Sequence, residues 1–400
     1  MAKFTKKVLP NGFTIIYEKR DVPVVSLILA TRFGSAFESE NKKGIAHFLE
    51  HMCFKGTKRR SAKQISEEIE SIGGILNAFT HEETTAYHTK VPSKYWKNAF
   101  DVIFDIFFNP NFPEEEIKKE ALVVCEEIKM YNDNPQYFVL NKIKEALYKK
   151  PFGLPISGNK ENVLSFNKEK LLEIHKNFYN PKNSILVVVG DISFENVLSF
   201  VENNLPKNSN LPIKKETKTE KKNEKLFFKR KELTQTNLSI GFHFPLSTEK
   251  ESYAAKVFNS ILGEGMSSKL FLEVREKRGL AYAIKSDLDI GKNYSYLYIY
   301  AGTDEEKKDE VIKVSLEEFS KLSDLTEREL EKAKEKVIGN FLLENEDSLS
   351  AATNLLMFEI TKKAEEYYKF EENIKKVYLE EIKRLAEKKD YSLIVLEPGN

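Results

Sequence analysis

At 400 residues the chain is longer than one hydrophobic core usually grows, so we expect two domains of about 200 residues each. Hydrophobic residues make up 41% of it, which is enough to bury two cores. The 63 Lys and Arg residues almost balance the 62 Asp and Glu residues, and the net charge of +1 excludes a global field that would recruit nucleic acid or an anionic membrane. We therefore expect neither partner.

The cysteine usage and the N-terminus indicate the compartment. Cys53 and Cys125 lie within apolar helical patterns rather than in a paired framework, which suits a reducing environment. The N-terminal residues include lysines but no apolar run of signal-peptide length, and the longest apolar stretch, 185–189, is too short to span a bilayer. We expect a cytoplasmic protein.

The chain is expected to open with a sheet. Residues 13–17 and 24–30 are apolar runs of strand length, and the Asn11-Gly12 turn signal precedes the first of them. Residues 75–80 and 84–91 form a second pair of strands by the same pattern. If 75–80 lies at a sheet edge, it can accept an extended peptide as an added strand. An ordinary interior strand is the alternative, and the pattern favours neither.

Between these strands, the stretch from Gly44 to Gly56 contains His47, Glu50 and His51 in the order H-x-x-E-H. On a helix, side chains three and four positions apart share a face, so two imidazoles and a carboxylate converge on one patch. Two imidazoles are a partial ligand set for zinc, and a carboxylate beside zinc-bound water can act as a general base. The competing interpretation is chance spacing on an amphipathic helix, which Gly56 is expected to cap.

A second informative helix is predicted over residues 113–131, where a proline and three glutamates mark its start. Glu120 and Glu127 are seven apart, nearly in register on one face, and flank the apolar run 121–125. A carboxylate beside such a run lies at a boundary or is buried with a partner, and a metal is one such partner. Spacing alone leaves open whether a carboxylate or another histidine supplies the third ligand.

The rest of the first half alternates helices with a buried strand at 184–191, and this mixed order indicates an α+β fold. We place the first domain at 1–205, a polar linker at 206–225 and a second domain at 226–400.

The second domain repeats the first coarsely. A strand is expected at 236–244 and a helix at 253–262, in the place of the H-x-x-E-H helix. Laid over His47 to His51, this helix offers residues 257–261, none of which is a metal ligand. A second helix is expected to run into residues 275–282. The expected architecture is two similar domains related by duplication, each a mostly antiparallel sheet flanked by helices.

Several motifs in the same order resemble the pitrilysin/insulinase family of inverted-zincin metallopeptidases, especially its short, processing-peptidase-like subunits. The resemblance covers most of the chain. It rests on His47–His51 followed after 76 residues by Glu127, and on the segments Gly34–Glu38, Gly74–Thr80, Gly153–Gly158, Tyr179–Pro181 and Arg275–Tyr282.

The resemblance implies one Zn²⁺ per chain, bound by His47, His51 and Glu127. Glu120 would be an auxiliary carboxylate and Glu50 the general base. Glu126 competes with Glu127 for the third ligand position, and register with Glu120 favours Glu127.

The resemblance also implies substrate contacts. Asn77, Ala78 and Phe79 match the edge strand that holds the peptide backbone in this family. Arg275 and Tyr282 match a pair from the second domain that contacts substrate, with Tyr282 a candidate donor to the oxyanion. From the residues alone, a surface arginine and a core tyrosine would be preferred.

The implied function is a zinc endopeptidase that cleaves peptides or small unfolded proteins in an enclosed chamber. Long family members build that chamber from four domains, so a chain with two is expected to form a homodimer, or a heterodimer with a related subunit. The alternative is a non-catalytic peptide-binding or scaffold subunit of the same family.

Overall fold

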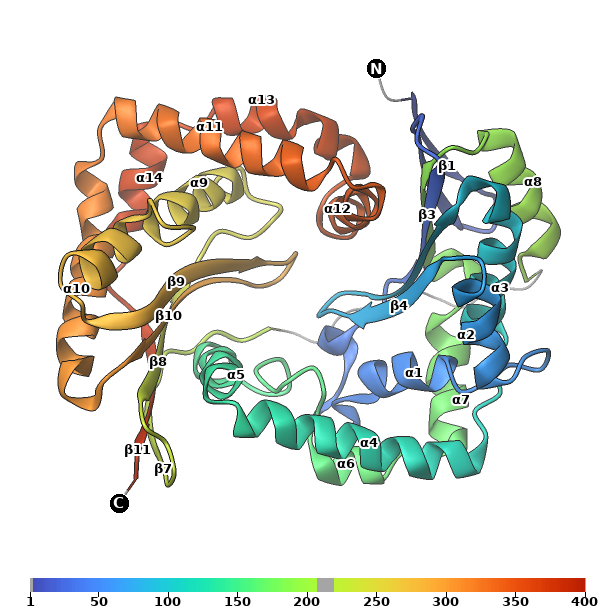
Figure 1. Ribbon diagram of the computed structural model, residues 1–400, viewed down its shortest axis with the longest axis horizontal. Coiled ribbons are helices and arrows are strands. Elements are labelled where there is room, and N and C mark those ends of the chain that lie inside the picture. Colours follow the sequence, from blue (N-terminus) through green and yellow to red (C-terminus); the bar gives the residue numbers. More distant parts are fainter. Residues whose placement is uncertain (1–2, 207–218, 400) are drawn as a thin grey trace. The chain divides into compact units, whose positions relative to one another are not determined.

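The computed structural model describes residues 3–206 and 219–399 (Figure 1). Residues 207–218, most of the expected linker at 206–225, lie outside this part. The chain forms two compact units. Unit 1 comprises the described residues of Met1–Ile128, Pro155–Thr217 and Leu343–Tyr367, and unit 2 those of Lys129–Leu154, Lys218–Leu342 and Tyr368–Asn400.

Unit 1 contains a six-stranded sheet in the order β1-β2-β6-β3-β5-β4. Its strands are β1 (Lys3–Val8), β2 (Thr14–Lys19), β3 (Val24–Thr31), β4 (Ile75–Thr80), β5 (Thr85–Pro92) and β6 (Ser184–Gly190). Neighbouring strands are antiparallel, except that β2 and β6 are parallel. Strand β4 therefore lies at an edge, which is the first of the two arrangements considered for residues 75–80.

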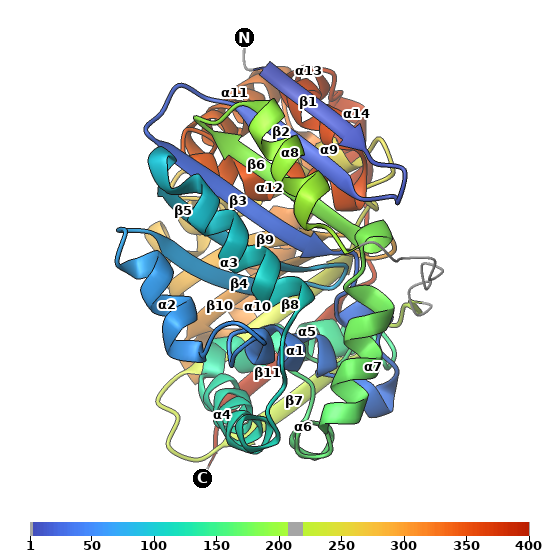
Figure 2. The same cartoon turned by 90° about the vertical axis from the view of Figure 1, so that its right-hand side faces the viewer.

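Helices cover both faces of this sheet. Helices α3 (Trp96–Phe108) and α8 (Phe194–Asn204) lie on one face, and α12 (Ser348–Thr361) packs on β3 and β6 from the other (Figures 1 and 2). Because both faces are covered, the central strands β3 and β6 are apolar almost throughout and nearly all their residues are buried.

The remaining helices of unit 1 include those of the candidate site. They are α1 (Ile45–Cys53), α2 (Ala62–Glu70), α6 (Lys160–Leu164), α7 (Lys168–Phe178) and the first part of α4 (Glu114–Asp133). Phe48, Leu49 and Met52 of α1 are fully buried in the core of the unit. Burial of this apolar face leaves His47 and His51 on a more accessible side of the helix.

Unit 2 contains a five-stranded sheet in the order β7-β11-β8-β10-β9. The strands are β7 (Lys225–Arg230), β8 (Thr236–His243), β9 (Ala281–Ile290), β10 (Ser295–Thr303) and β11 (Ser392–Pro398). Only the pair β7 and β11 is parallel. This is the order and direction of the unit 1 sheet without β1, so the predicted α+β class and the duplication are confirmed.

Helices also cover both faces of the unit 2 sheet. Helix α5 (Pro135–Leu147) packs on β8 and β11. Phe319 of α10 (Lys308–Ser320) stacks on Phe242, and Phe258 of α9 (Ser252–Leu262) contacts Phe244, on the opposite face. The other helices of the C-terminal half are α11 (Glu327–Glu344), α13 (Phe370–Lys375) and α14 (Leu379–Ala386).

The compact units differ from the predicted domains 1–205 and 226–400 in two segments, Lys129–Leu154 and Leu343–Tyr367, which contain the helices α5 and α12. Helix α5 comes from the first half of the sequence but belongs to unit 2, whereas α12 comes from the second half but belongs to unit 1. Gly241 on β8 permits the close packing of α5, because a Cβ there would lie 2.7 Å from Ile143 and 2.8 Å from Leu147. Sequence order alone does not reveal such an exchange.

Two predicted elements end differently in the structure. Helix α1 ends at Cys53 with Phe54 as its C-cap, so Gly56 lies beyond it. The helix predicted to run into 275–282 stops after a π-helical segment, Phe271–Glu276, and Gly279 then turns the chain with φ +59°. Tyr282 therefore lies on strand β9. Among residues 3–206 and 219–399, no helix has the length and apolar character needed to cross a bilayer.

Candidate metal centre

His47 and His51 are adjacent on one side of α1, with ring centroids 4.6 Å apart. Both are partly buried, with side-chain exposures of 13% and 23%. The N-cap of the helix is Gly44, whose φ of +100° favours glycine, and a Cβ added there would lie 2.7 Å from the carbonyl oxygen of Ser157. The predicted helical convergence of the two imidazoles is present.

Glu127 of α4 completes the group. Its Oε2 lies 3.7 Å from Nε2 of His47 and 3.6 Å from Nε2 of His51. One ligand atom from each of the three residues lies within 4.8 Å of the other two. Glu126, the competing choice, is exposed and outside this group. Among the described residues, Glu127 and not Glu126 therefore lies with the two histidines.

Glu120 orients His51. Its Oε1 lies 2.8 Å from Nδ1 of His51, and its Oε2 pairs with the Lys55 ammonium at 2.6 Å. Burial opposes the charged carboxylate, but the hydrogen bonds from His51 and Lys55 outweigh it and lower the pKa of Glu120. A carboxylate acceptor at Nδ1 places the proton there and leaves the Nε2 lone pair of His51 facing Glu127.

The pKa values of the two imidazoles are shifted in opposite directions. Burial, and then the neighbouring His51, lower the pKa of His47 to about 4, so this imidazole is neutral near pH 7. Burial also opposes the charged form of His51, but the hydrogen bond to Glu120 and nearby carboxylates raise its pKa. His51 is therefore the ligand whose proton a metal ion would have to displace.

Glu50 lies on the same helix and is held by the edge strand. The Thr80 hydroxyl at the end of β4 donates a hydrogen bond of 2.5 Å to Oε2 of Glu50. Burial raises the pKa of Glu50, although the Thr80 hydrogen bond opposes that shift. A partly buried carboxylate with a raised pKa has the character of a general base.

The donor set fits zinc. Two imidazole nitrogens and one carboxylate oxygen around one point are the three protein ligands of several catalytic zinc sites. Nδ1 of His47 is buried without a hydrogen-bond partner among the described residues, and its other nitrogen faces Glu127. Glu120 supplies the outer carboxylate that such sites require of a histidine ligand.

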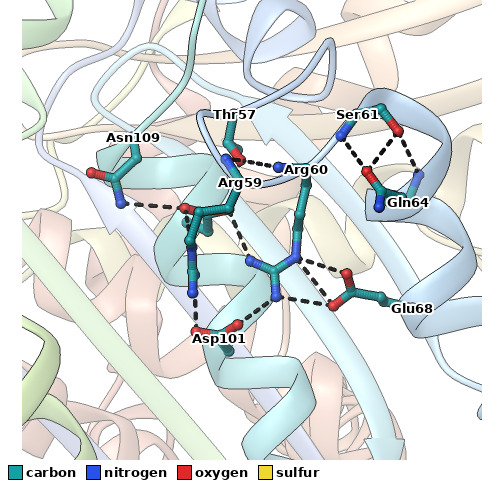
Figure 3. Close-up of polar contacts among 9 residues, drawn as sticks. Thr57, Arg59, Arg60, Ser61, Gln64, Glu68, Asp101 and Asn109 are labelled. Carbon is teal, nitrogen blue, oxygen red and sulfur yellow. Dashed lines mark hydrogen bonds and ion pairs between the residues drawn. The ribbon is translucent and has the colours of Figure 1, made fainter.

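The loop that follows α1 is anchored by a polar network (Figure 3). Arg60 pairs with both carboxylate oxygens of Glu68 and also contacts Asp101. The Thr57 hydroxyl donates to the buried Asp105 at 2.6 Å, and Arg60 contacts the same carboxylate at 2.8 Å. These contacts tie the C-terminal side of α1 to α2 and α3.

The three predicted edge-strand residues lie on β4. Asn77 is exposed, and Ala78 and Phe79 are partly buried. The Asn77 side chain accepts a hydrogen bond of 2.8 Å from the N–H of Ala78. An incoming strand that used this N–H would have to displace the Asn77 amide.

Arg275 and Tyr282 lie in unit 2. The Arg275 guanidinium is exposed and lies 4.9 Å from the ring centroid of Phe271. Tyr282 is 48% exposed and lies where the pairing of β9 with β10 shifts register, since Thr303 pairs with Ala281 and Gly302 with Ala283. Such a bulge re-aims the extra residue, so Tyr282 is not the core tyrosine that the residue pattern alone favours.

The Tyr282 ring packs against Gly302, which has no side chain. A Cβ at Gly302 would lie 2.4 Å from the Tyr282 hydroxyl. Tyr300 is hydrogen-bonded to Tyr282, and its hydroxyl donates to Oδ1 of Asn237 at 2.7 Å. These three residues help line a pocket of about 280 Å³ within unit 2, next to Gln235 and the start of α5.

Four residues of the site region are not among those that the sequence predicts: Thr80, Lys55, Tyr300 and Asn237. Thr80 ends the predicted strand 75–80, so its proximity to the motif helix could be found only once that strand is placed at the edge. Lys55 follows His51 by four residues but lies beyond the end of α1, so helical spacing does not predict its contact with Glu120. The sequence carries no signal for Tyr300 and Asn237.

A helix that bears H-x-x-E-H, a third ligand on a distant helix and a duplicated α+β framework together define the inverted zincins. The profile of the insulinase family, peptidase family M16, matches residues 14–160, and that of the peptidase M16 inactive domain matches residues 165–337. The metal-centre residues all lie within the first match. The chain belongs to this pitrilysin/insulinase family.

Relatives of similar length support the assignment. A Bacillus subtilis protein named uncharacterized zinc protease YmxG is 34% identical over 97% of both chains. A Rickettsia felis protein named uncharacterized zinc protease is 36% identical over 84% of this chain and 83% of its own. The crystal structure of a protease from Helicobacter pylori superposes with a TM-score of 0.90 at 22% identity, over 99% of this chain and all of its own, and supports the fold.

Proposed function

We propose that this chain is a zinc-dependent endopeptidase that cleaves peptides or small unfolded proteins. The observation that carries the proposal is the convergence of ligand atoms from His47, His51 and Glu127 within 4.8 Å of one another. Bound there, zinc would act as a Lewis acid that makes water nucleophilic near neutral pH and polarises a carbonyl.

Each residue of the site would then have its own role. His51 is held by Glu120 with Nε2 free to bind, and His47 is neutral at working pH. Glu50, oriented by Thr80, takes the proton of the attacking water and returns it to the leaving amine.

We propose that the peptide binds as an added strand along β4, at Asn77, Ala78 and Phe79. The exposed edge supports this, because backbone groups of β4 pair with β5 on one side only. Arg275 and Tyr282 would contact the substrate from unit 2, with the Tyr282 hydroxyl as a donor to the oxyanion. Extended-strand binding uses main-chain atoms, so we expect broad sequence tolerance.

The activity is tested with a quenched-peptide library and the zinc-loaded chain. We expect cleavage that stops when a chelator removes the metal and returns with added zinc. Retained activity in the metal-free protein would contradict a zinc mechanism.

The second candidate is a non-catalytic subunit that binds peptides or partners. The match of 165–337 to a domain described as inactive favours it. That match excludes the metal-centre residues at 47, 51 and 127, so it bears on the second repeat more than on the centre. Tight zinc and peptide binding without any cleavage product by mass spectrometry would select this candidate.

We further propose that two copies of the chain associate to close a chamber, with a heterodimer as the alternative. The support is that two repeats in one chain are half of the four that long family members use. A monomer mass from light scattering of the fully active enzyme would contradict this.

A further inference from the structure

The N-terminus of α1 is capped by a carboxylate from outside the helix. Gly44, the N-cap, has no side chain to accept from the first turn. Glu38 takes that role, because its Oε1 accepts from the N–H of Ala46 at 2.7 Å and its Oε2 from the N–H of Gly44 at 3.1 Å. His47 follows directly, so the capped turn is the one that carries a metal-centre histidine.

This capping carboxylate is part of a buried charge pair. The Lys43 ammonium is fully buried and lies 3.6 Å from Oε2 of Glu38, whose side chain is also fully buried. Lys43 donates to the carbonyl oxygen of Ser35 at 3.0 Å. Removal of one partner of a buried ion pair is destabilising, because the other charge then loses a nearby counter-charge in the interior.

The same cluster reaches the turn that ends β4. The Ser35 hydroxyl donates to the buried carboxylate of Glu82. The N–H of Ser35 donates to the carbonyl oxygen of His81 at 3.1 Å, and the N–H of Ala36 to that of Glu82 at 2.8 Å. Gly34 is needed for this approach, since a Cβ there would lie 2.1 Å from the His81 carbonyl oxygen.

Helix α1 and strand β4 are thus joined at two points. Thr80 contacts Glu50 on the exposed side of the helix, and the buried cluster connects the turn after Thr80 to the first turn of the helix. Two contacts fix both the rotation of a short helix about its axis and its position along the strand. A single contact would leave one of these free.

We propose that the buried Glu38–Lys43 pair is a positioning device that sets α1, and with it His47 and Glu50, relative to the edge strand β4. Neither side chain touches the reacting atoms in this proposal. The proposal rests on the proposed function for its consequence in catalysis, but the capping of α1 is independent of it.

The test compares Glu38→Gln with the parent in zinc affinity, measured by competition with a chromogenic chelator, and in amide hydrogen exchange of residues 44–48 without metal. Gln keeps one oxygen acceptor but turns an N–H₂ group toward either Gly44 or Ala46, and it removes the negative charge that Glu38 places beside Lys43. We expect faster exchange at 44–48, unchanged exchange in α9, and zinc affinity lower by about 10–100-fold, as for other residues that orient metal ligands.

Two further variants separate positioning from general damage. Glu40→Gln, at an exposed position two residues on, is the matched control and should behave as the parent. Glu38→Gln/Lys43→Met removes both charges, so it should fold even if the single variant does not, and should bind zinc more weakly than the parent. Parental zinc affinity in the folded double variant, or in Glu38→Gln, would overturn the proposal.

The link to β4 is tested with Ser35→Ala, which removes the hydroxyl bonded to Glu82 but keeps the carbonyl that Lys43 contacts. We expect a raised KM for peptide with little change in kcat or zinc affinity, and no change in Ser39→Ala, whose exposed hydroxyl contacts only Asn41 among the described residues. An unchanged KM in Ser35→Ala would remove β4 from the proposal. A parent chain that binds no zinc would instead refute the proposed function, while exchange at 44–48 would still decide the capping.

Discussion

Helices α1 and α9 occupy the same place in two repeats of one fold. Helix α1 follows strand β3, which lies beside β6 in the unit 1 sheet, and α9 follows β8, which lies beside the corresponding strand β11 in the unit 2 sheet. Helix α1 presents two imidazoles and a carboxylate, whereas the corresponding part of α9 is Val257–Ile261. The shared framework therefore does not carry the chemistry. The proposed zinc chemistry would depend on a few side chains of α1 and on one glutamate of α4.

The edge strands β4 and β9 differ in a related way. Strand β4 pairs with β5 residue by residue, which leaves a regular edge. Strand β9 shifts register at Gly302 and Thr303, and this irregularity exposes Tyr282. A regular edge suits a peptide backbone, and a bulged one suits the presentation of a single side chain.

Removal of the metal should have the largest effect and should act on unit 1 alone. Chelation is expected to abolish peptide cleavage and to lower the stability of unit 1 by about 4 kcal/mol if zinc is present at 1,000 times its Kd. Hydrogen exchange would show this as faster exchange in α1 and α4 with no change in α9. Equal destabilisation of both units would contradict a metal site confined to unit 1.

Glu50→Gln should rank next. The amide cannot take a proton, so turnover is expected to fall by about 10²–10⁴-fold while zinc stays bound. Ser260 takes the place of Glu50 when α9 is laid over α1, and its buried hydroxyl has no partner among the described residues. Ser260→Ala should therefore keep both activity and zinc. Parental cleavage rates in Glu50→Gln would show that the base is another group.

Gly302→Ala tests the bulged edge. Its Cβ would lie 2.4 Å from the Tyr282 hydroxyl and force that ring to move. If Tyr282 donates to the oxyanion, we expect kcat to fall by about 10²-fold, close to the effect of Tyr282→Phe, with zinc retained. Gly339→Ala in α11 is the matched control, because a Cβ there meets nothing within 4 Å. A parental kcat in Gly302→Ala would leave Tyr282 without a role in turnover.

Much of this could be predicted from local sequence. The 3.6-residue period brings His47 and His51 together, and the seven-residue spacing places Glu120 and Glu127 on one face, so the metal group is largely a property of two helices. The local pattern places Tyr282 at the end of a helix, whereas its position at a bulge depends on the partner strand β10. The exchange of α5 and α12 cannot be predicted from local sequence, because an apolar face shows that a helix is buried, not which sheet covers it.

The smallest predicted effects concern these exchanged helices. Gly241→Ala should destabilise unit 2 by about 1–3 kcal/mol, because the added Cβ overpacks the contact with α5.

In unit 1, Ser26 and Ser348 share a buried hydrogen bond of 2.8 Å between β3 and α12, and Ser26→Ala should cost about 1 kcal/mol of folding stability. The double variant Ser26→Ala/Ser348→Ala should recover part of that loss, since neither hydroxyl is then left unpaired. Hydrogen exchange resolved by unit would measure each effect. If Gly241→Ala destabilised unit 1 and left unit 2 unchanged, the assignment of α5 to unit 2 would be contradicted.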